Sequence, residues 1–157
     1  MFTFNDIAVI KTLSSILSLG ILVAGCTGTR PMNLGVHDGK LAPCPASPNC
    51  VSSQSTDKDH AVEPIRFSGT SAEAMADLKK VISAMPRAQI VTITGTYIHA
   101  EFTSALFRFV DDVEFCLDEN TRTIHLRSAS RMGSSDLGVN RKRIEDLRFA
   151  LNALHPK

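Results

Sequence analysis

Tryptophan is absent from the 157-residue sequence, tyrosine occurs once, and phenylalanine occurs eight times. This supply of aromatic rings is too small for a surface that stacks on carbohydrate. An excess of charge is also missing, because 17 Lys and Arg residues face 16 Asp and Glu residues and the formal net charge is +1. Proteins that bind nucleic acid usually carry a clear positive patch or stripe. We therefore expect no nucleic-acid partner.

Glycine and proline are too scarce for a collagen-like or disordered chain, with 9 Gly and 7 Pro against 43% hydrophobic residues. The sequence shows no internal repeat. Its length is sufficient for one ordinary domain and too small for two domains that each bury a core. We therefore expect a single folded domain.

The apolar stretch near the N-terminus is too short to cross a bilayer. It covers residues 12–23 after the basic Lys11, whereas a membrane-spanning helix needs about 20 apolar residues. A basic residue, a short apolar core and small residues at its end are typical of a secretory signal peptide. Residues 22–26 read LVAGC, which is similar to a bacterial lipobox. We predict a lipoprotein signal peptide over residues 1–25 and lipid attachment at Cys26, with an ordinary signal peptide or an uncleaved anchor as the alternatives.

Lipid attachment would place the chain in the bacterial cell envelope, facing the periplasm. A diacylglyceryl group on the thiol and a third chain such as palmitate on the amine would form a firm anchor, at about 0.8 kcal/mol per buried CH₂. Thr27, and not Asp, follows the cysteine, and this favours the outer membrane. We expect residues 26–40 to be a lipidated tether and residues 41–157 to form one domain.

Two further cysteines lie in a proline-rich segment. Five of the seven prolines fall between residues 27 and 69, and Cys44 and Cys50 bracket a short loop there. In an oxidising periplasm such a pair is expected to form a disulfide, with free thiols as the alternative. A zinc site that adds His60 would lack the short Cys spacing of zinc motifs. We therefore expect no metal and no cofactor, and we interpret Cys116 as a buried small hydrophobic residue.

The rest of the sequence predicts a helix, four strands and a second helix. Thr70 and Glu73 form a capping box, and apolar residues then recur at helical spacing until Pro86. Alternating and β-branched segments predict strands over residues 88–94, 97–103, 107–117 and 121–129. A last apolar stripe predicts a helix with Asn140 as its N-cap. The polar pair Asp111-Asp112 interrupts the third strand, where we expect a bulge.

This order of elements favours an α+β fold. We expect an antiparallel sheet of about four strands with both helices packed on one face. An ordered, proline-rich strap over residues 41–60 would precede it. The alternative is a small half-open barrel.

Three stretches resemble a known family. They are residues 41–53, followed by Asp57 and His60, then residues 109–115, and finally residues 127–141. Together they resemble domain-of-unknown-function family 1499 (DUF1499), and the likeness covers residues 41–154. The resemblance implies a shared fold and shared motif positions, but it implies no reaction.

The last two stretches contain the candidate site. Its residues are Asp111, Asp112, Glu114, Arg127, Ser128, Ser130, Arg131, Asp136, Asn140 and Arg141. Guanidinium groups and hydroxyls suit phosphate or carboxylate, and the short turn near residue 119 is expected to bring the two stretches together. Eight basic and eight acidic residues between Arg108 and Arg148 also suit a network of internal salt bridges. Paired carboxylates for acid–base catalysis or for a hard metal are a third interpretation.

The sequence contains no nucleophile elbow, no His-Glu-x-x-His motif and no Walker loop. We therefore expect a non-catalytic lipoprotein that binds a small anionic ligand or an envelope protein. The alternative is a hydrolase-like enzyme that uses the Asp, Arg and Ser cluster.

Overall fold

The computed structural model describes residues 27–155, so the predicted signal peptide and Cys26 lie outside the described residues. The elements are β1 (Cys50–Ser52), β2 (Ile65–Arg66), α1 (Ser71–Ala84), β3 (Ala88–Ile93), β4 (Tyr97–Thr103), β5 (Val110–Asp118), β6 (Thr123–Ser130) and α2 (Val139–Leu154). Within residues 27–155, neither helix is long and apolar enough to span a bilayer.

One antiparallel sheet contains all six strands. Its order is β1-β6-β5-β4-β3, and β2 pairs with a second part of β6. The predicted α+β class is confirmed, but the sheet has two strands more than expected. Both extra strands come from the proline-rich part of the chain, and they have only three and two residues. Segments this short carry no alternation that a sequence pattern could show.

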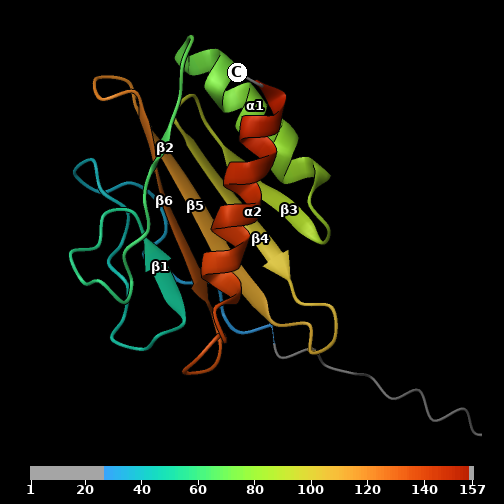
Figure 1. Cartoon of the computed structure of the whole chain (residues 1–157). Helices are drawn as coiled ribbons and strands as arrows, with labels where there is room; N and C mark the ends of the chain where they lie inside the picture. The colour runs from blue at the N-terminus through green and yellow to red at the C-terminus, as the bar shows by residue number, and fades with distance from the viewer. Residues whose placement is uncertain (1–26, 156–157) are drawn as a thin grey trace, which may run out of the picture.

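Both helices cover the same face of the sheet, as predicted (Figure 1). Alternation on β4 points Ile98, Ala100 and Phe102 into the core beneath them. The capping box of α1 is present: Thr70 Oγ1 accepts from the Glu73 amide (3.2 Å), and Glu73 Oε2 accepts from the Thr70 amide (2.8 Å). Local sequence signals therefore predict the helical layer and the face of β4 beneath it correctly.

The predicted N-cap of α2 is wrong. Gly138 is the N-cap residue, with a φ of 82°, and its side chain can offer no hydrogen bond. The carboxylate of Asp136 accepts instead from the amides of Gly138 (3.0 Å) and Asn140 (2.7 Å). The side chain of Asn140 is buried, and it serves the packing of the helix rather than its end.

The predicted bulge at Asp111-Asp112 is also wrong. β5 pairs in regular register on both sides of these residues, and the register shift lies between Ile90 and Thr92 of β3. The two carboxylates are accommodated without a bulge because each meets an arginine on its own face of the sheet.

The N-terminal segment crosses the face of the sheet that the helices leave uncovered, which we call the outer face. Arg30 forms an ion pair with Glu101 of β4, and the Gly35 amide donates to Glu114 Oε1 of β5 (2.7 Å). In Figure 1 this blue segment passes behind the sheet. At Arg30 and Gly35, the segment expected to be a tether is therefore bound to the domain.

The Cys44–Cys50 disulfide is present, and this prediction is confirmed. Cys116 is a buried free thiol on β5. The disulfide joins the strap to β1, which pairs with β6 beside the motif residues. It therefore fixes the strap against the edge of the sheet.

We expect the double variant Cys44→Ser/Cys50→Ser to lower the free energy of unfolding by about 2 kcal/mol, the loss expected for so short a loop. Urea denaturation measures the loss, and Cys116→Ser provides a single-thiol control. Thiol labelling of the denatured, unreduced protein should modify Cys116 and spare the pair. Labelling of Cys44 and Cys50 as well would contradict the assignment.

Candidate functional site

The predicted site residues do not form one cluster. Successive residues of a strand point to opposite faces of the sheet, so β5 and β6 divide the set. Asp111, Ser128 and Ser130 face the helices together with Asn140, whereas Asp112, Glu114, Arg127 and Arg131 face the outer side. The expected convergence into a single site is therefore wrong.

Asn140 is the centre of the helix-side cluster, and its amide is fully bonded. Its Oδ1 accepts from Ser128 Oγ (2.6 Å) and from Arg143 Nη1. Its Nδ2 donates to the carbonyl of Asn49 and to Ser130 Oγ, both at 3.0 Å. A buried polar group with every partner satisfied stabilises packing, so this amide joins α2, β6 and the strap.

Arg143 closes the same cluster. Its guanidinium forms an ion pair with Asp111 and lies 4.9 Å from the centre of the Phe102 ring. The site set predicted from sequence omitted both Arg143 and Asn49. Their positions, within or beside the stretches that resemble the family, were the only signals that could have found them.

Two further predicted residues lie apart from both clusters. Arg141 donates to the carbonyls of Ala61 (2.7 Å) and Asp59 (2.8 Å) and thereby holds the strap. Asp136 caps α2. Neither residue belongs to a common ligand site.

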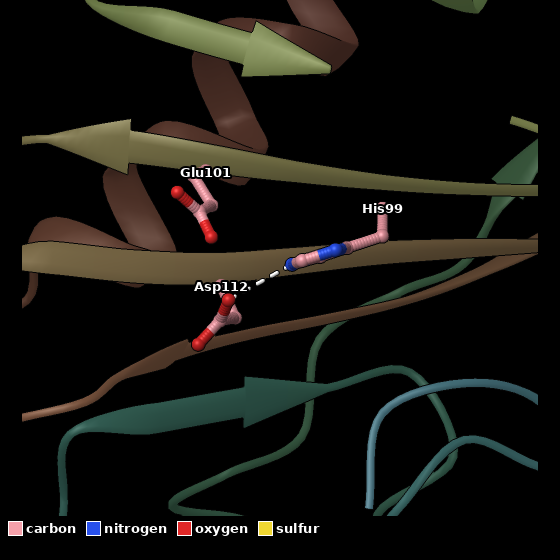
Figure 2. A group of neighbouring side chains, drawn as sticks. All are labelled: His99, Glu101 and Asp112. Carbon is pink, nitrogen blue, oxygen red and sulfur yellow. Dashed lines mark hydrogen bonds and ion pairs between the residues drawn. The ribbon is translucent and has the colours of Figure 1, made fainter. Parts of the chain in front are cut away.

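Arg131 is the centre of the outer-face cluster. Its Nε and Nη2 form a bidentate pair with the carboxylate of Asp112 at 2.8 and 2.7 Å, and Nη2 also donates to Glu101. His99 donates from Nε2 to Asp112 Oδ1 at 2.8 Å (Figure 2). Bidentate arginine–carboxylate pairs are among the strongest hydrogen-bonded contacts in proteins.

This arrangement keeps both carboxylates ionised. Burial acts to raise the pKa of Asp112, but hydrogen bonds from Arg131 and His99 outweigh burial and lower that pKa. Burial also acts to raise the pKa of Glu101, and hydrogen bonds from Arg131 and Arg30 again lower it overall. The hydrogen bonds to Asp112 raise the pKa of Arg131 in turn.

Three side chains of the outer-face cluster, His99, Glu101 and Asp112, are of the types that bind metal ions. His99, Glu101 and Asp112 each offer a ligand atom, and these atoms lie within 4.8 Å of one another (Figure 2). However, Arg131 binds both carboxylates and places a positive charge where a cation would be held. We therefore assign this group to a salt-bridge network and not to a metal.

Arg127 differs from Arg131 because most of its donors are free. Its Nη1 donates weakly to Glu114 Oε2 (3.4 Å), and this is the one hydrogen bond of its side chain within the described part of the chain. Its Nε is buried and has no partner there. Glu114 is better satisfied, since its Oε1 also accepts from Gly35 N and from Tyr97 Oη (2.8 Å). Burial and the negative charge of Glu114 raise the pKa of Tyr97.

An open cavity of about 400 Å³ lies over Arg127. We call it the outer-face cleft. Its floor is formed by β6 and its neighbours, with Asp112, Arg127, Ala129, Ser130 and Arg131, and its walls by Thr29, Pro31 and Asn33 together with Pro43, Cys44 and Pro45. The N-terminal segment and the disulfide-bonded strap therefore border an open cleft over a guanidinium with unused donors.

Comparison with known proteins places this domain in a family. A family model described as a protein of unknown function, DUF1499, matches residues 40–151. The chain belongs to the DUF1499 family. No curated protein matches the chain.

The matched range covers the cleft floor and the strap wall of this DUF1499 domain. The N-terminal wall, with Thr29, Pro31 and Asn33, precedes residue 40 and lies outside the match. The guanidinium groups of Arg127 and Arg131 thus belong to the family domain, whereas one wall of the cleft comes from a segment outside it.

Proposed function

We propose that this protein is a membrane-anchored envelope lipoprotein whose DUF1499 domain binds a small anionic ligand in the outer-face cleft and catalyses no reaction. The observation that carries this proposal is the state of Arg127. Its side chain is only 6% exposed, yet it makes one long hydrogen bond within residues 27–155. Nearly all buried polar groups in proteins have partners, and each exception needs an explanation.

An anion in the cleft would supply the acceptors that Arg127 lacks. Phosphate and carboxylate groups match the planar fork of a guanidinium and bind it in two-point fashion. Arg131 is already neutralised by Asp112 and Glu101, so its role is to fix the floor of the cleft. The ligand would therefore contact mainly Arg127.

The side chains around the cleft favour binding over hydrolysis. The hydroxyl of Ser128 donates to Asn140 on the opposite face of the sheet. Ser130 lines the cleft, but its hydroxyl is also bonded to Asn140, whose Nδ2 donates to it. The thiol of Cys44 is consumed in the disulfide. The buried His99–Asp112 pair thus has no serine or cysteine nucleophile held against it within the described residues, and a nucleophile within hydrogen-bond reach of a base is what an acyl-transfer site requires.

Titration of the purified full chain with inorganic phosphate, and separately with acetate, tests the proposal. Arg127→Met should weaken binding at least about tenfold, since a hydrogen bond to a charged group contributes about 1.5–3 kcal/mol. Glu114→Gln should strengthen binding, because it removes the negative charge that competes with phosphate for the same guanidinium. Arg66→Met, which alters an exposed arginine of β2, is the matched control and should bind as the wild type does.

Isothermal calorimetry gives the affinities, and thermal melts show whether each variant is folded. Equal affinity in the wild type and in folded Arg127→Met would place any bound phosphate elsewhere. Absence of both phosphate and acetate binding in the wild type would refute the proposal.

A further inference from the structure

Two loops meet at one end of the sheet. β5 runs antiparallel to both neighbours, so the β4–β5 loop (residues 104–109) and the β6–α2 loop (residues 131–138) lie at the same end (Figure 1). A hydrogen bond from Arg131 N to Val110 O (3.1 Å) joins their bases. This end also carries the first turn of α2.

Large apolar side chains are concentrated on these loops. Ten large hydrophobic side chains are exposed among the described residues, and six belong to this end: Leu106, Phe107, Phe109, Met132, Leu137 and Val139. We call these six residues the apolar tip. Leu137 is 94% exposed and Leu106 is 79% exposed. Exposed apolar residues gathered at one site mark a surface that binds a partner.

The backbone holds these side chains outward. Leu137 has a φ of 54° and Arg108 a φ of 59°, a conformation that non-glycine residues adopt only at a cost. The rings of Phe107 and Phe109 stack with centres 5.6 Å apart. The loops therefore have defined shapes that present apolar groups to the surroundings.

The position of the N-terminal segment identifies the partner. Gly28 lies directly against the tip, since a Cβ added there would be 2.8 Å from Arg131 Cβ and 3.0 Å from Met132 Cγ. Cys26 precedes Gly28 by two residues, which span at most about 7 Å in an extended chain. A lipid on Cys26 would therefore bring the bilayer to the apolar tip.

The charge of the tip fits the same partner. Arg108 lies between Phe107 and Phe109 in the sequence, is exposed, and makes no side-chain hydrogen bond among the residues described. The loops contain one acidic residue, Asp136, and its carboxylate is occupied by two backbone amides. Aromatic and aliphatic groups beside a free basic residue are typical of segments that enter the interfacial region of a membrane.

We infer that the apolar tip inserts into the interfacial region of the bilayer that holds the lipid anchor. This inference rests on the anchor of the proposed function but not on its anion cleft. It also orients the domain, because Arg131 belongs to both the cleft floor and the base of the tip loop. The outer-face cleft then lies next to the headgroups.

Depth-dependent quenching tests the insertion. Single cysteines at Leu106→Cys, Leu137→Cys or Asn120→Cys are added to the full chain in a Cys116→Ala background and labelled with an environment-sensitive fluorophore. Asn120 is an exposed turn residue at the opposite end of the sheet and is the matched control. The proteins are reconstituted in phosphatidylethanolamine–phosphatidylglycerol vesicles with brominated acyl chains. Quenching at positions 106 and 137 should exceed that at position 120 at least twofold.

Quenching at either loop no greater than at position 120 would overturn the inference. A blue-shifted but unquenched label would overturn it too, because it would show that protein, such as a second copy of this chain, covers the tip. Circular dichroism verifies that each labelled protein is folded. Mass spectrometry of Cys26 reports the anchor separately, so loss of the anchor and failure of insertion are distinguishable.

Discussion

Replacing Arg131 with methionine is expected to lower the free energy of unfolding by about 3–5 kcal/mol, the usual cost of removing one partner from a buried ion pair. The variant would leave Asp112, whose side chain is 1% exposed, without its bidentate partner. Glu101 would keep only Arg30, which is itself half exposed. Methionine retains much of the volume of arginine, so the loss would report mainly the uncompensated charge.

Urea denaturation at pH 7 measures this loss, and Arg66→Met should stay within about 0.5 kcal/mol of the wild type. The pH dependence gives a second readout. In the folded protein the pKa values of Asp112 and Glu101 lie below their ordinary values of 3.8 and 4.5. Their stabilisation is therefore complete above about pH 5 and is lost as the pH falls through the folded-state values. In Arg131→Met this acid-dependent loss should shrink, and parallel stability curves between pH 7 and pH 3 would contradict the assignment.

The regular elements could be predicted because their signals are local. The Thr70–Glu73 capping box specifies the start of α1 within four residues, and alternation over Tyr97–Thr103 specifies both the strand and its two faces. Counting residues back from the short turn near residue 119 along both strands also places Arg127 near Asp111, Asp112 and Glu114. In the structure it pairs directly across from Glu114, two positions from Asp112.

The additional strands and the role of Asn140 could not be predicted in this way. β1 and β2 exist because β6 offers them an edge, and their partners lie more than 50 residues away in sequence. Asn140 stands at a position that suits an N-cap, but its partners come from β6 and the strap. Such long-range contacts decide the structure wherever local preference is weak.

The division of the candidate site did have a signal in the sequence. Asp111 and Asp112 are neighbours on a strand, so they must point to opposite faces. The same holds for Arg127 and Ser128, and this requires two clusters instead of one. The incomplete bonding of Arg127, in contrast, depends on how Gly35 and Tyr97 share Glu114, which only the assembled fold reveals.

The proposed lipid anchor predicts the other large effect, which is all-or-none. Membrane fractions of cells that express the wild type should contain a chain whose first residue is Cys26 and which carries a diacylglyceryl group. Cys26→Ser should abolish this species completely, because the serine offers no thiol for the lipid. The product should be an unprocessed precursor that keeps residues 1–25, or a domain released from the membrane.

Cys116→Ala is the matched control for that experiment. It removes a free thiol buried on β5 and should leave lipidation unchanged. Intact-mass spectrometry separates the three species. A wild-type chain that is cleaved before Cys26 but carries no lipid would contradict the anchor. If the domain released by Cys26→Ser still binds phosphatidylethanolamine–phosphatidylglycerol vesicles, the apolar tip has an affinity of its own for the membrane. The anchor would then fix the orientation of a domain that already prefers the membrane surface.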